Sequence, residues 1–209
     1  MTYITGHSLR LPSYAGQAQT DEDLLVQAAR GGDREAFNGL VIKHQDRAYT
    51  LAYRILGDPA AAADATQEAF ILAYRHIRSF HTGSFFTWLY RIVTNVCYDA
   101  LRYQKRRPAV SFSRLGGAAD DDDREFDAPT HDDSPETVVQ RHELAALLQR
   151  HINALPADQR IALVLSDVQG LSYKEIADVT RTNLGTVKSR LNRARARMRQ
   201  SLSGVQLAL

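Results

Sequence analysis

The sequence contains one cysteine in 209 residues, so the chain can form no internal disulfide and no cysteine-based zinc site. Its seven histidines are scattered and show no zinc-binding spacing. No apolar run is long enough to span a bilayer, and the first twenty residues lack the basic start and apolar middle of a secretory signal. We therefore expect a cytoplasmic protein that does not insert into membranes and holds no metal or other cofactor. Cys97 lies among aliphatic residues and is predicted to be buried.

Alternating β-branched residues, which would indicate strands, are also missing from the first half of the chain. Apolar residues recur there at three- and four-residue steps, and residues that favour helix starts precede each repeat. The expected starts are Thr20 or Asp21 for a helix over 22–30, Asp33 for a helix that ends at Gly57, Asp58 with Pro59 for a third helix, and Ser84 for a fourth. The predicted fold class is all-α.

Charge is distributed unevenly along the chain, although the net formal charge is only +2. The segment 109–136 holds nine acids, including the run Asp120 to Asp123, and two arginines, so it carries −7 while the remainder carries +9. Prolines and glycines interrupt this segment and it offers few apolar residues, which favours a flexible acidic linker. The predicted organisation is a disordered tail over 1–20, a small helical domain over 21–108, the linker over 109–135 and a second small helical domain over 136–203.

The segment from Leu171 to Met198 predicts a helix-turn-helix, two helices joined by a tight turn. Ser172 and Glu175 form a capping box, so the first helix should begin near Tyr173, and Thr182 is the expected cap of the second. The inward stripe of the second helix consists of Leu184, Val187, Leu191, Ala194 and Met198. Its other side carries groups that can read base edges or bind phosphate: Thr186, Lys188, Ser189, Asn192 and Arg193. Six cations and no acid over 188–199 favour DNA binding over an ordinary solvated face, which normally mixes signs.

The helix expected after Ser84 has a second, non-aliphatic face, made of Trp88, Arg91, Asn95, Tyr98 and Arg102. Aromatic rings stack on unpaired bases, arginine binds phosphate, and asparagine bonds to a base edge. This face therefore predicts a contact with single-stranded nucleic acid. In the alternative interpretation, Trp88 belongs to the core and the other side chains form a polar surface.

The helix expected after Asp58 also leaves a mixed acidic and apolar stripe outside its alanine-rich buried side. The stripe consists of Asp64, Gln67, Glu68, Ile71 and Arg75. On composition alone it fits a solvated surface as well as a protein-binding one.

Five motifs combine in this chain: Asp64-Ala-Thr-Gln-Glu-Ala-Phe-Ile-Leu-Ala-Tyr74, Phe85-Phe-Thr-Trp-Leu-Tyr-Arg-Ile-Val-Thr-Asn95, Leu155-Pro156, Gly170-Leu-Ser-Tyr-Lys-Glu-Ile-Ala177 and Gly185-Thr-Val-Lys-Ser-Arg190. Together they resemble bacterial RNA polymerase sigma factors of the small extracytoplasmic-function (ECF) type, in the sigma-70 family. The resemblance covers residues 21–202, and a generic helix-turn-helix protein would match only the last two motifs. It implies a sigma-2-like helical bundle followed by a sigma-4-like helix-turn-helix domain.

The resemblance also implies roles for the three stripes. The residues that would dock on the clamp of the polymerase's largest subunit are Asp64, Gln67, Glu68 and Phe70. Those that would melt the minus-10 element and capture a flipped base are Trp88, Arg91, Asn95 and Arg102, with a pocket formed by the loop from His81 to Ser84. Those that would read the minus-35 duplex are Thr186, Lys188, Ser189, Asn192 and Arg193. Further implied partners are the flap of the second-largest subunit, promoter DNA and an anti-sigma factor.

The predicted function is therefore that of an alternative sigma factor, which binds core RNA polymerase and directs promoter-specific initiation without being an enzyme. The alternative is a conventional helix-turn-helix transcription factor that binds duplex DNA without polymerase, but such a protein has no use for the Trp88 face. A nuclease that uses Asp120 to Asp123 is disfavoured, because metal-binding carboxylates need rigid placement. The chain departs from the resemblance at Arg181, a turn position where many relatives have glycine, and in the length and acidity of its linker.

Overall fold

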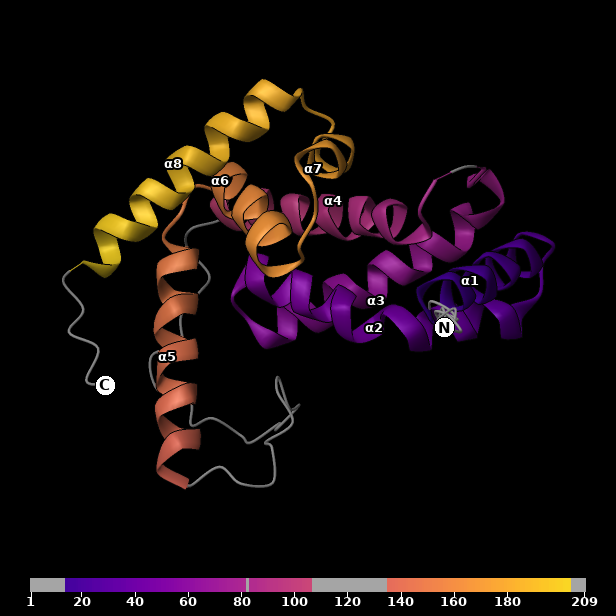
Figure 1. Ribbon diagram of the computed structural model, residues 1–209, viewed down its shortest axis with the longest axis horizontal. Coiled ribbons are helices and arrows are strands. Elements are labelled where there is room, and N and C mark those ends of the chain that lie inside the picture. Colours follow the sequence, from indigo (N-terminus) through magenta and orange to yellow (C-terminus); the bar gives the residue numbers. More distant parts are fainter. Residues whose placement is uncertain (1–13, 82, 107–134, 204–209) are drawn as a thin grey trace, which may run out of the picture.

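The computed structural model describes residues 14–81, 83–106 and 135–203, and within these ranges the chain forms helices and no strands (Figure 1). The elements are α1 (Tyr14–Arg30), α2 (Arg34–Leu56), α3 (Pro59–His76), the 3-10 turn η1 (Ile77–Ser79), α4 (Phe85–Arg106), α5 (Pro135–Asn153), α6 (Ala157–Leu163), the π-helical turn η2 (Val164–Val168), α7 (Tyr173–Thr180) and α8 (Leu184–Leu202). The all-α prediction is confirmed. The expected linker lies outside the described ranges except for Pro135, which begins α5.

The helix starts in the N-terminal module, α1 to α4, mostly follow the expected caps. The Asp33 carboxylate accepts hydrogen bonds from the Glu35 and Ala36 amides, and Asp58 caps α3 in the same way, with Pro59 in the first turn. Gly57 ends α2 in the left-handed conformation. The prediction for the first helix was wrong, because α1 begins at Tyr14 and runs through the expected caps. The alanines and glutamines over 14–20 favour helix strongly enough to extend it past the capping residues.

The core of this module lies between α2, α3 and α4. Buried alanines on α3, at positions 62, 65, 69 and 73, let the neighbouring helices approach closely. Cys97 is fully buried as predicted, and burial raises the pKa of its thiol to about 12. His44 is also buried, with its ring 5.4 Å from that of Phe85 and its Nε2 atom 3.2 Å from a Glu22 carboxylate oxygen. Desolvation lowers the pKa of His44.

The C-terminal module, α5 to α8, contains the predicted helix-turn-helix in α7 and α8. The Ser172 and Glu175 capping box is present, and α7 begins at Tyr173. Thr182 was the wrong cap for α8. The cap is Asn183, whose side chain accepts a hydrogen bond from the Thr186 amide at 2.8 Å, while the Thr182 hydroxyl bonds to that of Thr180.

The buried stripe of α8 matches the prediction at three positions, Val187, Leu191 and Ala194. Met198 is partly buried against the core. Leu184 was predicted to face inward, yet it is 48% exposed. It is the first residue of α8, where the helix end extends beyond the packed turns.

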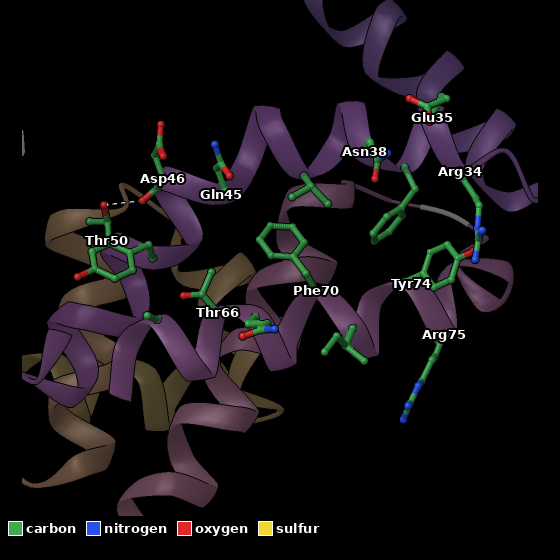
Figure 2. Close-up of a pocket in the computed structure, with 16 residues that line it drawn as sticks. Arg34, Glu35, Asn38, Gln45, Asp46, Thr50, Thr66, Phe70, Tyr74 and Arg75 are labelled. Atoms are coloured by element: carbon green, nitrogen blue, oxygen red, sulfur yellow. Dashed lines mark hydrogen bonds between the residues drawn. The ribbon is translucent and has the colours of Figure 1, made fainter. Parts of the chain in front are cut away.

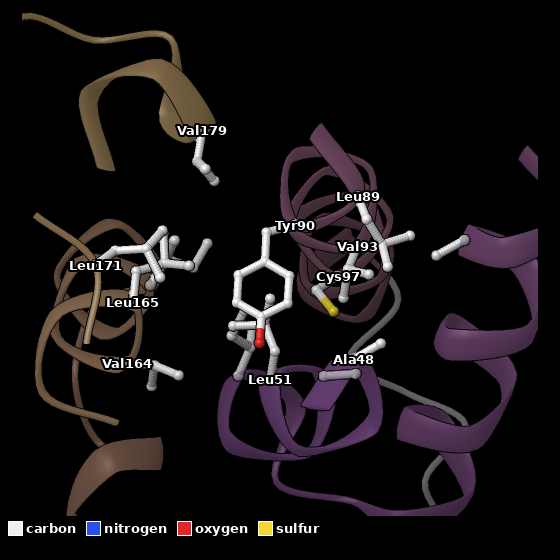
Figure 3. Packing of buried hydrophobic residues seen from close by; sticks show 14 of the residues in the cluster. Ala48, Leu51, Leu89, Tyr90, Val93, Cys97, Val164, Leu165, Leu171 and Val179 are labelled. Carbon is white, nitrogen blue, oxygen red and sulfur yellow. The ribbon is translucent and has the colours of Figure 1, made fainter. Parts of the chain in front are cut away.

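The two modules pack against each other around Tyr90 of α4, and their apolar residues form one cluster. Figure 3 shows Val164, Leu165 and Leu171 of the C-terminal module on one side of Tyr90, Val93 and Cys97 of α4 on the other, and Leu51 of α2 below the ring. Helix α7 lies over α4, and α6 and η2 contact α2. We call this packing the docked arrangement. No helix in the described ranges has both the length and the apolarity needed to cross a membrane.

Candidate nucleic-acid and protein interfaces

The first candidate surface is a groove of about 1450 Å³ between α2 and α3, which we call the α2–α3 groove (Figure 2). Phe70 lies at its base and is nearly buried, whereas Ile71 and Tyr74 are 45% and 43% exposed. The Tyr74 ring packs edge-on against Phe37, and its hydroxyl accepts a hydrogen bond from Arg34 Nε at 3.3 Å. An apolar floor between polar rims suits the docking of another protein segment.

Of the four residues predicted to bind polymerase, Gln67 and Phe70 line this groove. Asp64 and Glu68 are exposed on α3 outside its lining. The sequence prediction missed the opposite wall, which α2 supplies through Asn38, Val41, Gln45 and Tyr49. These four residues recur at helical spacing on one side of α2, so the same periodicity could have identified them.

The second candidate surface is on α4 and consists of Trp88, Arg91, Asn95 and Arg102; we call it the α4 surface. Trp88 is half-buried, with its ring 5.3 Å from Phe80 and 5.6 Å from Phe85, so the tryptophan supports the core and also reaches the surface. Arg91 is half-buried, whereas Asn95 and Arg102 are exposed. Tyr98, which the sequence placed on the same face, donates a hydrogen bond to Asp158 of α6. This bond raises the pKa of the Tyr98 hydroxyl and holds its ring away from a free stacking position.

A smaller cleft of about 430 Å³ lies beside Trp88, and we call it the α4–α7 cleft. One wall comes from the N-terminal module: Phe80, Gly83, Ser84, Thr87, Trp88 and Arg91. The other wall comes from α7: Lys174, Glu175 and Asp178. Of the expected loop from His81 to Ser84, Gly83 and Ser84 line this cleft, and Thr82 lies outside the described ranges. The contribution of α7 could not be predicted, because no sequence pattern indicated that the two modules dock.

The third candidate surface consists of Thr186, Lys188, Ser189, Asn192 and Arg193, and we call it the α8 surface. Lys188, Asn192 and Arg193 are exposed, while the two hydroxyl residues are half-exposed. The Ser189 hydroxyl donates to the Thr186 carbonyl at 3.0 Å. Because the buried stripe fixes the opposite side of the helix, these five residues lie on one accessible side.

The cationic run on α8 is less uniform than its sequence indicates. Arg190 forms an ion pair with Asp158 at 2.8 Å, and Arg195 forms one with Asp167 at 2.5 Å. The hydrogen bond from Arg195 lowers the pKa of the Asp167 carboxyl. The cations that make no ion pair with any described residue are Lys188, Arg193, Arg197 and Arg199. The described part of α8 therefore still carries unpaired positive charge beside the polar groups of the α8 surface.

No group of three or more His, Cys, Asp or Glu side chains in the described ranges could hold a metal ion. The run Asp120 to Asp123 lies outside those ranges.

Two family models match the chain, Sigma-70 region 2 over residues 40–107 and Sigma-70 region 4 over residues 145–198. The chain is 39% identical over 175 residues to the ECF RNA polymerase sigma factor SigE of Mycolicibacterium smegmatis, covering 82% of this chain and 65% of that protein. It is 40% identical over 189 residues to the RNA polymerase sigma-H factor of Pseudomonas aeruginosa, covering 88% and 95%. For the ECF RNA polymerase sigma-E factor of Escherichia coli K12, the values are 38% over 180 residues, covering 85% and 92%. The chain thus spans just under two thirds of the first relative and most of the other two.

Two solved structures share the fold over most of the chain. One is CnrH in complex with the cytosolic domain of CnrY, with a TM-score of 0.63, 25% identity and coverage of 88% of this chain and 97% of that one. The other is the sigma factor RpoE in complex with the anti-sigma factor NepR from Bartonella quintana, with a TM-score of 0.61, 24% identity and coverage of 81% and 98%.

Proposed function

The chain belongs to the sigma-70 family as an ECF RNA polymerase sigma factor with regions 2 and 4, and we propose that the three surfaces described above make its contacts with promoter DNA and polymerase. A protein of this family is not an enzyme. It directs promoter-specific transcription initiation with RNA polymerase, which carries out the nucleotidyl transfer.

The α8 surface reads the minus-35 duplex in the major groove. Lys188 and Arg193 supply exposed cations for phosphate and base contacts, and Asn192 supplies an exposed amide that matches an adenine edge. Thr186 lies in the first turn of α8, which suits a position near the bases when the helix enters a groove by its N-terminal end.

The α4 surface melts the minus-10 element and holds its unpaired strand. Trp88 offers a ring for stacking, Arg91 a cation for the backbone, and Asn95 an exposed amide for a base edge. Opening needs no ATP, because stacking of extruded bases on the protein offsets unstacking, which costs a few kcal/mol per base step. Arg102 extends the same surface toward the end of α4.

The α2–α3 groove, together with Asp64 and Glu68, docks on the clamp of the polymerase's largest subunit. Its apolar floor and exposed polar rim support this assignment. The C-terminal module contacts the flap of the second-largest subunit. Holding both modules on one enzyme lets their separate DNA contacts reinforce each other through effective concentration. The protein therefore acts in the cytoplasm, where polymerase and promoter DNA are found.

An anti-sigma factor is the expected regulator of this chain. The two structural relatives were solved with the cytosolic domain of CnrY and with the anti-sigma factor NepR, respectively. An anti-sigma factor that covers the α2–α3 groove would compete directly with polymerase.

The observation that carries the proposal is the presence of two different nucleic-acid surfaces in one chain. The α8 surface suits duplex DNA, whereas the aromatic and amide groups of the α4 surface suit unpaired bases. A conventional transcription factor that reads only duplex operators has no need for the second surface.

The decisive test is run-off transcription from a genomic fragment library with purified core polymerase, with and without the protein, followed by mapping of the starts. We expect discrete protein-dependent starts that share two spaced upstream elements. If no such starts appear and the free protein binds duplex DNA tightly, the proposal is wrong and a conventional transcription factor is favoured.

A further inference from the structure

Helix α1 lies outside the residues that the region 2 model matches, which begin at residue 40. It still packs on the N-terminal module, where Val26 and Ala29 are buried, and it contacts both α2 and η1. Among the described residues, α1 contributes none to the lining of the α2–α3 groove or of the α4–α7 cleft. The proposed function therefore leaves this helix without a role.

The first contact of interest joins the end of α1 to the connection between η1 and α4, which runs from Phe80 to Ser84. Arg30 is the last residue of α1, and its Nη2 atom lies 3.1 Å from Nδ1 of His81. A guanidinium can only donate, so the His81 ring accepts this hydrogen bond through an unprotonated Nδ1 atom. His81 is the one hydrogen-bond or ion-pair partner of Arg30 in the part of the chain that the structure describes. This bond ties α1 to the start of the connection.

The second contact reaches the other end of the connection through a buried pair. Glu22 of α1 is buried, and one of its carboxylate oxygens lies 2.7 Å from Lys43 Nζ and 3.2 Å from His44 Nε2. The centre of the His44 ring is in turn 5.4 Å from that of Phe85, the first residue of α4, and 6.1 Å from that of Phe86. Because a buried carboxylate is costly unless it is paired, this contact fixes where α1 sits against His44.

The ring of Trp88 depends on both ends of the same connection. Its centre lies 5.3 Å from that of Phe80 at the start and 5.6 Å from that of Phe85 at the end. Gly83 and Ser84, between them, line the α4–α7 cleft beside Trp88. A ring that stacks on a base binds best when it is already held in place, because ordering it on binding costs free energy. Contacts that fix the two ends of the connection therefore prepare Trp88 for a base.

We propose that α1 positions the α4 surface: Arg30 and Glu22 hold the two ends of the connection between η1 and α4, and through them the ring of Trp88, in the geometry that captures an unpaired base. Arg30 is a positioning residue, because it acts through His81 and does not itself contact DNA. The proposal rests on the proposed function, since it needs the α4 surface to bind the minus-10 strand.

The first experiment measures promoter opening by the full-length protein with the substitutions Arg30→Met and Arg30→Lys. Methionine keeps an unbranched stem without a donor, whereas lysine keeps both the charge and a donor. We expect Arg30→Met to reduce opening about fivefold, as for the loss of one hydrogen bond, and Arg30→Lys to recover part of it. Permanganate reactivity of promoter thymines in the assembled polymerase complex measures opening. The control Arg150→Met, which alters an exposed arginine of α5, should open the promoter like the wild type.

A double-mutant cycle with His81→Ala separates positioning from direct binding of DNA by Arg30. If Arg30 acts through His81, Arg30→Met should cause no further loss of opening in the His81→Ala background. If Arg30 binds a phosphate instead, its loss causes the same reduction in both backgrounds and lowers the slope of log K against log salt concentration by about 1. That second result overturns the proposal.

Glu22→Gln tests the second contact with a side chain of the same shape and no charge. We expect opening to fall about fivefold, while affinity for core polymerase stays at the wild-type value because the α2–α3 groove is unchanged. Glu143→Gln on α5, which alters an exposed glutamate, is the matched control. Thermal denaturation followed by circular dichroism checks that each variant is folded at the assay temperature. If opening and polymerase affinity fall by the same factor, α1 only supports the fold and the proposal is wrong.

The outcomes also separate this proposal from the proposed function. If run-off transcription depends on the wild-type protein and both Arg30→Met and Glu22→Gln open the promoter normally, the proposed function stands and positioning by α1 is wrong. If run-off transcription does not depend on the wild-type protein, the proposed function is wrong and the positioning role loses its basis.

Discussion

The α8 surface and the α4 surface differ in how freely DNA can reach them. The α8 surface consists of side chains on the accessible side of a helix whose other side is buried, and it projects Lys188, Asn192 and Arg193 into solvent. On the α4 surface, Trp88 packs against Phe80 and Phe85, and both Trp88 and Arg91 line the α4–α7 cleft, which α7 borders on its other side. The α8 surface is therefore directly accessible in the described structure, whereas the centre of the α4 surface is reached through a cleft that α7 borders.

This difference matches the energetics of the two DNA contacts. A duplex major groove presents its base edges without any change in the DNA, so a rigid, exposed helix is sufficient. The bases of a duplex must first be unpaired and unstacked before they can stack on a protein surface, which costs a few kcal/mol per base step. The exposed α8 surface thus suits the duplex recognition that we propose for it, and the partly enclosed α4 surface suits the proposed capture of unpaired bases.

The largest effect is expected from Arg160→Met, which removes a buried guanidinium that links α6 to α2 and to the end of α5. The Arg160 guanidinium donates to the carbonyl oxygens of Ile55, Asn153 and Leu155. Loss of these charged donors leaves buried acceptors unsatisfied and should lower the free energy of unfolding by about 3 kcal/mol. Thermal denaturation followed by circular dichroism measures the change.

Arg150→Met is the control for this prediction, because Arg150 is exposed near the end of α5. We expect it to change stability by no more than about 0.5 kcal/mol. Equal melting temperatures for the two variants would show that the Arg160 hydrogen bonds contribute nothing to stability.

The next effect tests the α4 surface itself through Asn95→Ala and Trp88→Ala. Each variant should reduce promoter opening by roughly ten- to hundredfold, since a base contact of this kind contributes about 1–3 kcal/mol. Permanganate reactivity of promoter thymines in the assembled polymerase complex measures opening. Affinity for core polymerase should stay unchanged.

Trp88 and Asn95 are not equivalent in this test. Trp88 also packs against Phe80 and Phe85, so its truncation lowers stability, whereas Asn95 is exposed. Trp88→Phe keeps a ring in place and should recover part of the opening activity. A collapse of polymerase affinity in Asn95→Ala would mean that the assignment of this surface to DNA is wrong.

A smaller effect sharpens the description of the α8 surface. Lys188→Ala should weaken duplex binding by the polymerase complex almost equally for all promoter sequences and reduce the slope of log K against log salt concentration by about 1. Asn192→Ala should instead relax the preference at one base pair, by about 1–3 kcal/mol. Fluorescence anisotropy over a salt series distinguishes the two, with Arg150→Ala on α5 as the charge control.

The local structure was largely predictable because helix ends depend on a few neighbouring residues. The Ser172 capping box and the Asp58-Pro59 start are confirmed, and Arg181, noted from the sequence as a turn position, lies in the left-handed region. The predicted cap of α8, Thr182, was wrong by one residue, because the neighbouring Asn183 caps the helix. The cap is the residue whose side chain reaches the free amides at the start of the helix. In the structure the Thr182 hydroxyl bonds to the Thr180 hydroxyl instead, and the sequence gives no sign of this contact.

The docked arrangement could not be predicted from the sequence. Its links join residues far apart in the chain, such as Tyr90 with Gln169 and Tyr98 with Asp158. Periodicity shows which side of a helix is apolar but not which element covers it. The sequence therefore predicted that Tyr98 is free to stack on a base, and it did not predict that α7 forms the second wall of the α4–α7 cleft.

The smallest effect concerns the turn between α7 and α8, which connects the helix over the α4 surface with the helix that carries the α8 surface. Arg181 occupies the left-handed region there, with φ 51° and ψ 46°. The left-handed conformation is unfavourable for a residue with a Cβ atom, and glycine removes that cost. Glycine also loses more backbone entropy on folding, which offsets part of the gain. Arg181→Gly should therefore stabilise the protein by about 0.5–1 kcal/mol. Arg181→Ala distinguishes an effect of the backbone from one of the side chain. It keeps the Cβ atom, so it should show no such gain in thermal denaturation.

Neither surface includes Arg181. In Arg181→Gly, acrylamide quenching of the fluorescence of Trp88, the only tryptophan in the chain, and the affinity for duplex DNA should therefore both stay at wild-type values. A change in Trp88 quenching would instead show that the conformation of this turn helps to hold α7 over α4.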